Sequence, residues 1–457
     1  MVVGAISSRS ELVVIGAGPG GYVAALRAAD AGLEVTLVER DQIGGTCLNV
    51  GCIPSKALIE VANTRHHALQ GQSLGLDATI AVDGDRLRTH LASVSEPLRH
   101  GVHTLLTDAG VTVVNGRASF ARYDRLSIES GGQVSHLEFD NAILATGSRP
   151  LELPGFALGG SVVSSTGALR LATVPASMTI IGGGYIGIEL GTAWAKLGTK
   201  VTVVEAAETI LPDTPLELRQ PVQRRLSQLG VTVHTACRAE QSVPGGLRLD
   251  NGTEVTAEII VVAVGRRPNS DQASIDTLDL QIDSHGHIVV DSRMQAGRGL
   301  YAIGDLVTGP ALAHKASAEA EVAVQAILGE PTAFDPAALP SVIYCDPEIM
   351  TVGVPLSQAS ELGCSTHRFP HAASARARTL GDTSGATFIV VDEHETIVGM
   401  HAVGPHVAEL AGEAALAVEM AATLQDLTLT IHAHPTMSES LSEAGWLARG
   451  TPLHIRR

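Results

Sequence analysis

Residues 11–39 read ELVVIGAGPGGYVAALRAADAGLEVTLVE, and this stretch decides the fold. The short apolar run Glu11–Ile15 predicts a buried strand. The glycine-rich turn Gly16–Gly21 follows, then the alanine-rich segment Tyr22–Ala31, which predicts a helix, and a second strand, Leu33–Glu39. A strand, GxGxxG, a helix and a strand that ends in an acid together form the pattern of a Rossmann dinucleotide-binding unit. An ordinary glycine-rich turn is the alternative for the glycines alone, but it leaves the elements around them unexplained.

Each residue of this fingerprint has a physical role. Gly16 permits the tight turn, Gly18 lets the backbone approach a pyrophosphate, and Gly21 lets the helix pack against the strand. The N-terminus of the helix attracts the phosphates. Glu39 is placed to accept hydrogen bonds from a ribose. The sequence therefore predicts a bound dinucleotide at this first site.

The same pattern recurs further along the chain. Met178–Ile181 predicts a strand, Gly182–Gly187 reads GGGYIG, and a helix leads to a strand over Lys200–Glu205. The key positions shift by one constant, since 182 − 16, 187 − 21 and 205 − 39 all equal 166. Two such sites imply electron transfer between two different dinucleotides. The carboxylate of Glu205 would repel a 2′-phosphate, so we expect NAD rather than NADP at the second site.

Two further predicted strands carry the chain out of these units. His136–Ala145 leads into Thr146-Gly147, and Glu258–Val264 leads into Gly265-Arg266. Glycine at these points suits a backbone that passes close to a cofactor, although an ordinary strand-to-loop turn remains open for each. Leu300–Asp305 is another predicted strand that ends in an acid.

The last part of the chain forms a separate α/β unit. Phe334–Pro340 reads as a linker. Beyond it the apolar patterns predict strands over Ser341–Tyr344, Thr387–Val391 and Thr396–Val403, and a helix over Val407–Leu424.

Residues 44–56 read GGTCLNVGCIPSK and carry the chemistry. On a helix, Cys47 and Cys52 would lie a little over one turn apart, and a distorted helix start would bring their sulfurs to bonding distance. We expect a distortion at Pro54, because proline cannot donate a backbone hydrogen bond. A structural staple normally closes a long loop, which this spacing does not do. The pair therefore suggests a working dithiol, while two buried free thiols remain the alternative on spacing alone.

A histidine near the C-terminus is a possible partner for these thiols. His434 precedes Pro435, which disfavours helix at the histidine. Glu439, five residues on, is placed to reach back to the imidazole and raise its basicity. A dithiol enzyme needs such a base, because the thiolate is the nucleophile. The chain has 18 histidines, however, and most must be surface or core residues.

Composition bounds the class of protein. A chain of 457 residues suggests about three domains, and 45% apolar residues are ample for their cores. The net charge of −17 argues against nucleic acid and favours a basic partner. Five cysteines do not make a secreted disulfide scaffold. No apolar run is long enough for a membrane span, and Val2–Ile6 is too short for a signal peptide. We therefore expect a cytoplasmic protein.

Taken together, these stretches resemble the flavin disulfide reductases, and within them the dihydrolipoamide dehydrogenases. The resemblance runs from about Glu11 to Glu443 and includes the redox motif at 44–56. Gly304-Asp305 with 312–315 (LAHK) resembles the motif that closes the flavin domain, and 432–436 (HAHPT) with Glu439 resembles the base motif. Gly167 and Cys345 depart from the pattern, where glutamate and threonine are usual.

The resemblance implies FAD at the first site, NAD at the second, and no metal. It assigns catalysis to Cys47, Cys52, Lys56, His434 and Glu439, with Lys56 beside the flavin and paired with Glu189, although a surface ion pair is the simpler alternative. The residues implied for FAD are Gly16, Gly18, Gly21, Glu39, Gly45, Thr46, Lys56, Ala118, Thr146, Gly147, Asp305 and Ala313. Those implied for NAD are Gly182, Gly184, Gly187, Glu189, Glu205, Gly265 and Arg266.

The implied fold is α/β, with two Rossmann-like three-layer domains and a C-terminal α+β dimerisation domain. We expect an FAD-binding domain over 1–145, completed by a central domain over 271–335, an NAD-binding domain over 146–270, and an interface domain over 336–457. The implied partners are a second copy of the chain, a lipoyl domain, and the basic peripheral-subunit-binding domain of an acyltransferase core.

The implied activity is oxidation of protein-bound dihydrolipoyl groups by NAD⁺ in a 2-oxoacid dehydrogenase complex. The ending Leu453-His454-Ile455 is similar to that of the branch serving branched-chain substrates. Another flavin disulfide reductase is one rival, but Glu205 argues against NADPH and no cysteine pair lies near the C-terminus. A non-catalytic redox sensor is a second rival, against which the joint presence of both cysteines, Lys56, His434 and Glu439 argues.

Overall fold

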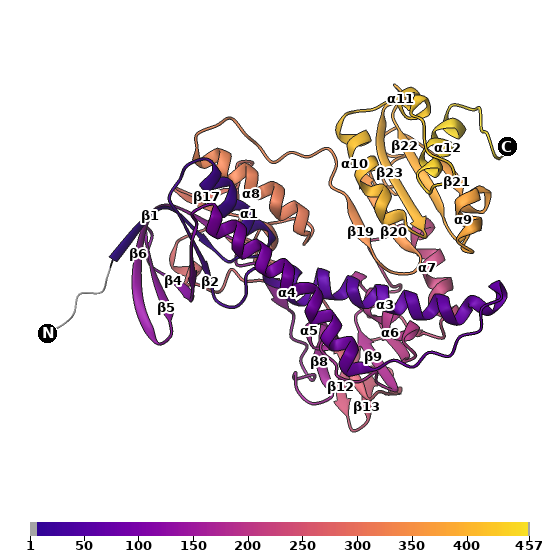
Figure 1. Cartoon of the computed structure of the whole chain (residues 1–457), viewed down its shortest axis with the longest axis horizontal. Coiled ribbons are helices and arrows are strands. Elements are labelled where there is room, and N and C mark those ends of the chain that lie inside the picture. The colour runs from indigo at the N-terminus through magenta and orange to yellow at the C-terminus, as the bar shows by residue number, and fades with distance from the viewer. Residues whose placement is uncertain (1–6, 456–457) are drawn as a thin grey trace.

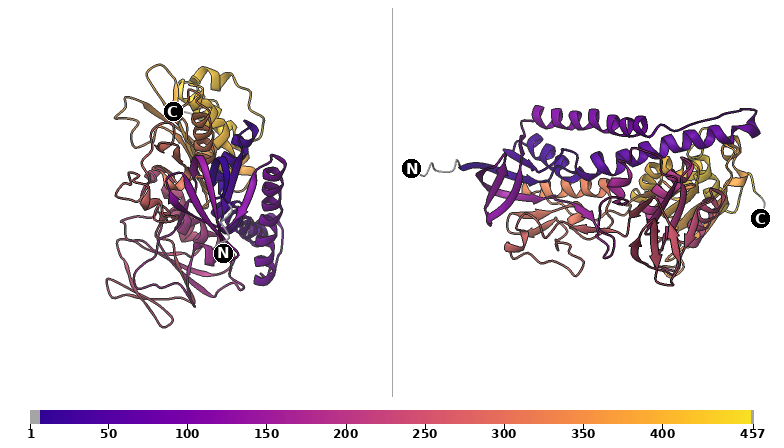
Figure 2. Two further views of the ribbon diagram at one scale, coloured as in Figure 1. Left: turned by 90° about the vertical axis from the view of Figure 1, so that its left-hand side faces the viewer. Right: turned by 90° about the horizontal axis from the view of Figure 1, so that it is seen from below.

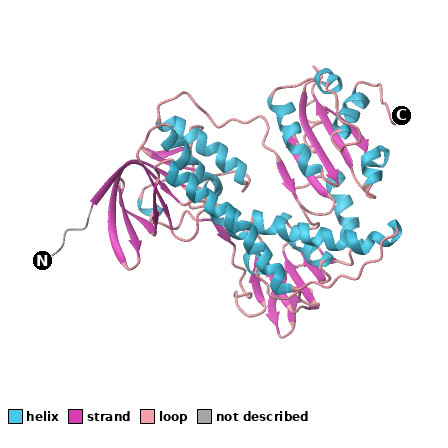
Figure 3. Cartoon of the chain, in the orientation of Figure 1, coloured by secondary structure: helices cyan, strands magenta, loops and turns pink. Residues whose placement is uncertain are grey.

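The computed structural model describes residues 7–455, so Val2–Ile6, where we expect no signal peptide, lies outside the described residues. Three α/β units are arranged around two long helices, α3 (Cys52–Gln70) and α4 (Gly84–Asp108). The N-terminal unit occupies one end of the molecule, and the other two lie together at the opposite end (Figures 1 and 3). The predicted α/β class is confirmed.

The N-terminal unit is built on a sheet in the order β17-β18-β6-β1-β2-β3. The central strands β1, β2 and β6 pair in parallel, as expected for a Rossmann unit, and β18 joins them in parallel from far along the sequence. The hairpin β4–β5 pairs with β6 at one side. The strands are β1 (Ser7–Ile15), β2 (Val35–Glu39), β3 (Thr112–Asn115), β4 (Arg117–Arg122), β5 (Arg125–Ser130), β6 (Gln133–Leu144), β17 (Gln295–Gly297) and β18 (Leu300–Ala302).

Helices α1 (Pro19–Asp30) and α8 (Ala313–Ile327) pack side by side on one face of this sheet. Their alanines, such as Ala24, Ala28 and Ala320, are fully buried, because small side chains let the two helices and the sheet approach closely. The opposite face packs against β4, β5 and the segment after Asp271. The unit therefore combines the strands before residue 145 with β17, β18 and α8 from much later in the sequence.

The second unit is a parallel sheet in the order β11-β10-β9-β15-β8. The antiparallel strands β12-β13-β14 lie beside it, and the short pair β7–β16 forms where the chain passes between the first two units. The strands are β7 (Ser148–Pro150), β8 (Val162–Ser164), β9 (Ser177–Ile181), β10 (Lys200–Val204), β11 (Thr232–His234), β12 (Ala239–Val243), β13 (Gly246–Leu249), β14 (Glu254–Thr256), β15 (Ile259–Val262) and β16 (Arg266–Pro268). The helices are α5 (Ser165–Ala168), α6 (Tyr185–Lys196) and α7 (Leu216–Gln228).

The C-terminal unit is an antiparallel sheet in the order β19-β20-β23-β22-β21, covered by helices (Figure 2). Its strands are β19 (Ser341–Ile343), β20 (Glu348–Gly353), β21 (Ser365–Pro370), β22 (Ala386–Val391) and β23 (Ile397–Gly404). Its helices are α9 (Ala375–Thr379), α10 (Ala411–Glu419), α11 (Leu424–Leu429) and α12 (Glu439–Ala448).

The helical stretch predicted over Val407–Leu424 is present but interrupted. A 3₁₀ turn occupies Val407–Leu410, α10 ends at Glu419, and Ala421 has a positive φ of 49°, which stops the helix. A new helix then starts after Thr423, whose side chain forms a reciprocal capping box with Asp426. The segment is rich in alanine and contains no proline, so its composition favours helix throughout and did not predict the break.

One apolar cluster joins the second and third units. It contains Leu58 of α3, Trp194 of α6 and Val222 of α7, together with Ile349 and Phe388 of the C-terminal sheet, and all of these are buried. These units therefore share a core, with α3 between them. Among residues 7–455, no helix has the length and apolar character needed to cross a membrane.

Two buried histidines make the stability of the C-terminal unit pH-dependent. His371 and His401 are 0% and 2% exposed, and burial lowers the pKa of each from 6.5 to about 4. The unfolded chain therefore binds more protons than the folded chain between pH 6.5 and 4. Stability is fully present above pH 6.5 and falls as the pH drops through this window, by about 2 kcal/mol per histidine at pH 5.

This dependence is tested by replacing one histidine and comparing two pH values. In His401→Gln, the loss of unfolding free energy between pH 7.5 and pH 5, measured by urea denaturation, should be smaller by about 2 kcal/mol than in the parent. His394→Gln is the control, because the His394 side chain is 79% exposed. An equal loss in His401→Gln and the parent would contradict the prediction.

Candidate active site

The first fingerprint loop joins β1 to α1 and is shaped by close backbone contacts. Gly16 has a φ of +101°, and a Cβ there would lie 2.4 Å from the carbonyl oxygen of Ala145. A Cβ on Gly21 would lie 1.8 Å from the carbonyl oxygen of Gly16, so only glycine lets α1 pack this tightly on the turn. Above Gly18, in contrast, nothing lies within 4 Å of a Cβ position. The loop thus has a crowded inner side and an open outer side at the N-terminus of α1.

The two acids at the ends of the second strands are held alike. The carboxylate of Glu39 accepts hydrogen bonds from the amides of Ala17 (2.7 Å) and Asp41 (2.8 Å). The carboxylate of Glu205 accepts from the amides of Gly183 (2.6 Å) and Ala207 (2.7 Å). The amide donors also differ by 166 positions (183 − 17 and 207 − 41). The sequence repeat is therefore accompanied by the same pattern of hydrogen bonds to the two carboxylates.

Glycine contacts in the second loop match those in the first. A Cβ on Gly187 would lie 2.0 Å from the carbonyl oxygen of Gly182, and nothing lies within 4 Å of a Cβ on Gly184. The second loop therefore also presents an open backbone at the start of a helix, α6.

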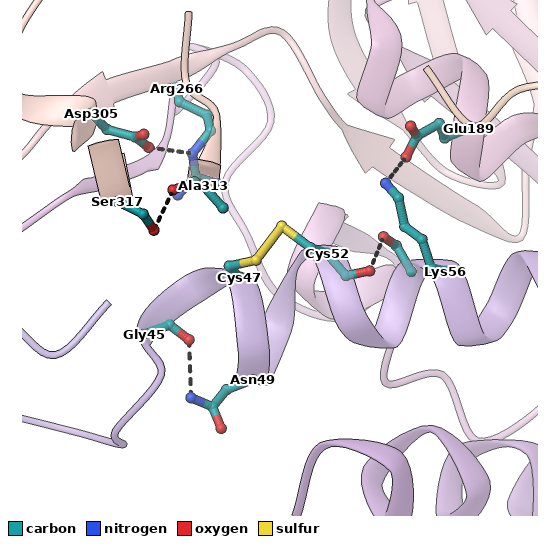
Figure 4. The surroundings of a disulfide bond; sticks show 11 residues. Gly45, Cys47, Asn49, Cys52, Lys56, Glu189, Arg266, Asp305, Ala313 and Ser317 are labelled. Carbon is teal, nitrogen blue, oxygen red and sulfur yellow. Dashed lines mark hydrogen bonds and ion pairs between the residues drawn. A yellow bond between two sulfur atoms is a disulfide. The ribbon is translucent and has the colours of Figure 1, made fainter. Parts of the chain in front are cut away.

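Cys47 and Cys52 form a disulfide, with Cα atoms 4.6 Å apart (Figure 4). Cys47 lies in the short helix α2 (Gly45–Val50), and Cys52 is the first residue of α3. The predicted distortion is present, but it lies at Gly51 (φ −135°, ψ −107°) rather than at Pro54. Pro54 lies in the first turn of α3, where the missing N–H has no helical acceptor to lose. The open alternative of two free thiols is excluded by the bond.

Lys56 lies one turn beyond Cys52 on α3 and forms an ion pair with Glu189 of α6. The Nζ–Oε2 distance is 2.8 Å, and the side chains are 34% and 6% exposed (Figure 4). The pair is therefore not an exposed surface contact, because the carboxylate is almost completely removed from water. A buried carboxylate requires such a partner.

A cavity of about 370 Å³ runs from the first fingerprint to the disulfide. Its wall includes both cysteines and most of the residues predicted for FAD. Gly21 is the exception, since it packs behind the turn. Of the residues predicted for NAD, Glu189 and Arg266 also reach this wall. The predicted residues on the wall are Gly16, Gly18, Glu39, Gly45, Thr46, Lys56, Ala118, Thr146, Gly147, Asp305, Ala313, Glu189 and Arg266.

Asp305 lies at the junction of the first two units. Its carboxylate accepts a hydrogen bond from Ser148, whose Oγ is also 2.7 Å from Nε of Arg266, and Arg266 Nε lies 3.9 Å from the carboxylate itself. Behind it, a fully buried ion pair joins Lys315 and Glu319 at 2.7 Å. Glu319 also accepts a bond from the amide of Gly304 (2.7 Å), which fixes the turn that presents Asp305.

His434 and Glu439 lie in the C-terminal unit, before and at the start of α12. The imidazole Nδ1 is 2.9 Å from Oε1 of Glu439, whose other oxygen accepts from the amide of Thr436. The His434 side chain is 70% exposed, and it is not part of the cavity wall within the described chain. The structure thus forms the predicted pair, and the pair is not among the residues that line the cavity of this chain's own disulfide.

Matches to known proteins cover the whole chain. The model of the family described as pyridine nucleotide-disulphide oxidoreductase matches residues 10–320, and the dimerisation domain of that family matches residues 339–445. The chain belongs to the pyridine nucleotide-disulphide oxidoreductase family. It is 42% identical to a dihydrolipoyl dehydrogenase of Geobacillus stearothermophilus, over 100% of this chain and 99% of the relative, and 43% identical to dihydrolipoyl dehydrogenase 2 of Haloarcula marismortui, over 100% of both.

Solved structures of family members have the same architecture. LpdA from Mycobacterium tuberculosis superposes with a TM-score of 0.91 at 25% identity, over 96% of this chain and 99% of that one. The HOCl-induced flavoprotein disulfide reductase RclA from Escherichia coli superposes with a TM-score of 0.86 at 26% identity, over the same shares. The chain is an NAD-dependent flavoprotein disulfide oxidoreductase, as predicted, because it belongs to this family and its full-length relatives are dihydrolipoyl dehydrogenases. Its dimerisation domain supports a homodimer.

The family implies FAD and NAD(H), and the residues present fit both. The open backbone at Gly18 and Gly184 leaves room for phosphates at the N-termini of α1 and α6. Glu39 and Glu205 are held at the positions where a ribose hydroxyl needs an acceptor. The disulfide borders the first site, so the sulfurs and the flavin would share one cavity.

Sequence reasoning missed Ser148, Asn269 and the Lys315–Glu319 pair. Asn269 donates to the carbonyl oxygen of Thr146 (2.8 Å), which ties the two strand exits together across 123 positions. Ser148 follows Gly147, and Asn269 follows Pro268, both in the predicted turns. Their position next to these turn residues was the only sequence signal of a role in the site. The departure at Gly167 has a steric reason, since a Cβ there would lie 2.8 Å from Cβ of Val163.

Proposed function

We propose that this chain oxidises dihydrolipoyl groups carried by a partner protein and passes the electrons to NAD⁺. The observation that carries the proposal is the Cys47–Cys52 disulfide in the wall of the first dinucleotide cavity, beside the ion pair of Lys56 with the buried Glu189. A disulfide that spans only four intervening residues restrains the unfolded chain little, so we assign it a redox role rather than a stabilising one. The similarity to dihydrolipoyl dehydrogenases over the full chain supports the choice of substrate.

In this proposal the sulfur chemistry is a pair of thiol–disulfide exchanges. A substrate thiolate attacks Cys47, the S–S bond to Cys52 breaks, and a mixed disulfide forms. The second substrate thiolate then displaces Cys47, which releases the oxidised, cyclic disulfide and leaves both cysteines reduced. Two thiols are consumed and two are formed, so the exchange balances. Cys52, one turn before Lys56, is then the thiolate that the ammonium stabilises.

The protons need a base, and we assign that role to His434 of the second subunit. Its Nδ1–H donates to Glu439, so Nε2 is the nitrogen that accepts a proton from the substrate thiol. Its 70% exposure in one chain suits a side chain completed by a partner. FAD, when held in the cavity that Cys47, Cys52 and Lys56 line, would supply the two-electron chemistry that links the dithiol to NAD⁺.

The partner we propose is the acyltransferase core of a 2-oxoacid dehydrogenase complex, held through its basic peripheral-subunit-binding domain. The net charge of −17 supports a basic partner. Three free cysteines, Cys237, Cys345 and Cys364, are compatible with the cytoplasm, where thiols stay reduced. Pull-down of the tagged protein from its native cell, followed by identification of the acyltransferase that comes with it, tests this part. A pull-down that contains none would refute it.

The activity itself is tested with free dihydrolipoamide. The purified protein should reduce NAD⁺ in its presence and should fail with glutathione in its place. An enzyme that reduces NAD⁺ with neither dihydrolipoamide nor glutathione would refute the proposal, as would one that prefers glutathione.

Glu205 sets the choice of nicotinamide cofactor in this proposal. Its carboxylate is anchored by Gly183 and Ala207, where a 2′-phosphate would meet a fixed negative charge. We expect kcat/KM for NADP⁺ to be at least about 10²-fold below that for NAD⁺. Glu205→Gln should narrow this gap by raising the value for NADP⁺, while Glu208→Gln, nearby in the chain, serves as the control. Equal use of both cofactors by the parent enzyme would contradict the assignment.

A further inference from the structure

We propose that Tyr344 is a positioning residue for Lys56, through which the C-terminal unit holds the redox lysine beside Cys52. Tyr344 follows β19, in the part of the chain that matches the dimerisation domain. The inference rests on the proposed role of Lys56, and it extends that role to a residue outside both dinucleotide-binding units.

Tyr344 contacts the lysine directly and also through Glu189. The Lys56 ammonium lies 4.6 Å from the centroid of the Tyr344 ring, within the range of a cation–π interaction. The same ammonium is 2.8 Å from Oε2 of Glu189. The backbone amide of Tyr344 donates to the other carboxylate oxygen, Oε1, at 2.9 Å. Lys56, Glu189 and Tyr344 therefore form a closed triangle, with one corner each from α3, α6 and the C-terminal unit.

Both Glu189 and the Tyr344 ring restrain the position of the Lys56 ammonium. Glu189 is buried, and both of its oxygens are engaged, so its carboxylate has one orientation. The aromatic ring limits the remaining freedom of the lysine stem, which is one of the longest and most flexible side chains. Without the ring, the carboxylate alone holds the ammonium of a lysine whose side chain is 34% exposed.

Tyr344 is itself fixed by the residues that follow it. Asp346, two positions on, forms ion pairs with Lys196 of α6 (2.7 Å) and Arg225 of α7 (3.3 Å). Lys196 is 4% exposed and also donates to Asn63 of α3 (2.6 Å). The segment from Tyr344 to Asp346 is thus tied to the same two helices, α3 and α6, that carry Lys56 and Glu189.

The consequence lies at Cys52. Lys56 is four residues further along α3, so the place of its charge determines how well a Cys52 thiolate is stabilised. Removal of the Tyr344 ring should let the ammonium move toward water. The thiolate then loses part of its stabilisation, and the thiol should titrate at higher pH.

The experiment uses full-length holoenzyme, first reduced with excess dithiol. Alkylation of Cys47 and Cys52 by iodoacetamide is followed against pH, resolved by peptide mass spectrometry, and kcat and KM for dihydrolipoamide are measured in parallel. In Tyr344→Leu we expect the alkylation midpoint of Cys52 to rise by about half a pH unit or more and kcat to fall about three- to tenfold, with KM unchanged. Tyr344→Phe keeps the ring and should stay within about twofold of the parent.

A double-mutant cycle separates positioning from general damage. If Tyr344 acts through Lys56, then adding Tyr344→Leu to Lys56→Met should shift neither the midpoint nor kcat further. Tyr123→Leu is the control for loss of a partly exposed tyrosine, since Tyr123 lies on the β4–β5 turn. If Tyr344→Leu does not fold, Tyr344→Met replaces it as an unbranched apolar side chain without a π face.

Three results would overturn the inference. They are an unchanged Cys52 midpoint in Tyr344→Leu, an equal defect in Tyr344→Phe, and fully additive effects of Tyr344→Leu and Lys56→Met. The alkylation measurement does not depend on turnover. A parent enzyme that failed to oxidise dihydrolipoamide would refute the proposed function and would still report whether Tyr344 and Lys56 are coupled.

Discussion

Cys52→Ser is expected to reduce dihydrolipoamide-linked NAD⁺ reduction to below roughly 0.1% of the parent rate. The variant has no Cys47–Cys52 disulfide to exchange with the substrate dithiol, and a serine hydroxyl does not form the thiolate that Lys56 is placed to stabilise. The loss should lie in kcat, because the substrate site remains. The measurement is NADH formation from dihydrolipoamide under saturating substrate.

The same variant should keep the part of the reaction that bypasses sulfur. Oxidation of NADH by a small one-electron acceptor such as ferricyanide needs the two dinucleotide sites and no disulfide, so it should stay within about threefold of the parent rate. Cys364→Ser is the matched control, since Cys364 is a free cysteine remote in sequence from the redox stretch. Full dihydrolipoamide turnover by Cys52→Ser would refute the scheme. Loss of both reactions would indicate a damaged flavin site rather than a missing thiol.

Local patterns predicted the elements around the two dinucleotide sites well. The alternation of strand, glycine turn and helix lies within about thirty residues, and each glycine has a steric reason that any chain must obey, such as the contact of Gly21 with Gly16. The constant shift of 166 between the fingerprints is repeated in the amides that hold Glu39 and Glu205. A repeat in sequence became a repeat in hydrogen bonding because the same backbone turn recurs.

Contacts made across long stretches of sequence were the ones that no local pattern predicted. Tyr344 lies 155 positions from Glu189, and Asp346 lies 150 positions from Lys196, yet each pair is in direct contact. No periodicity links such residues, since their meeting depends on how the C-terminal unit packs on α3 and α6. The Lys56–Glu189 pair, 133 positions apart, was predicted only through family resemblance.

The break between the two cysteines shows a subtler limit. Proline was the obvious source of distortion, but Pro54 fits within the first turn of α3, and the chain bends at Gly51 instead. A Cβ at Gly51 would lie 3.0 Å from the carbonyl oxygen of Thr46, so the bend uses the small size of this residue. Tertiary packing decides whether the helix breaks at the glycine or at the proline, and a local sequence pattern does not contain that information.

His434→Gln is expected to slow dihydrolipoamide oxidation by at least about 10²-fold, while NADH oxidation by ferricyanide stays near the parent rate. The glutamine fills a similar volume and keeps a hydrogen bond to Glu439, but it cannot accept the thiol proton. A matched control exists in a second histidine whose carboxylate partner, Glu443, lies on the same helix as Glu439. His454 pairs with Glu443 at 2.6 Å and is 67% exposed, against 2.9 Å and 70% for His434 with Glu439. His454→Gln should therefore leave both reactions unchanged, and an equal loss in the two variants would contradict a role as base.

Mixed dimers decide which subunit supplies that base. If His434 serves the disulfide of the other subunit, a dimer of one Cys52→Ser chain and one His434→Gln chain has one site with both defects and one intact site. Refolding the two inactive variants together in equal amounts makes half of the dimers mixed, so about a quarter of the parent activity should return. If His434 instead served its own chain, every site would keep one defect, and mixing would restore nothing. The His434 side chain is 70% exposed and does not line the cavity of its own chain, so we expect a quarter of the parent activity to return.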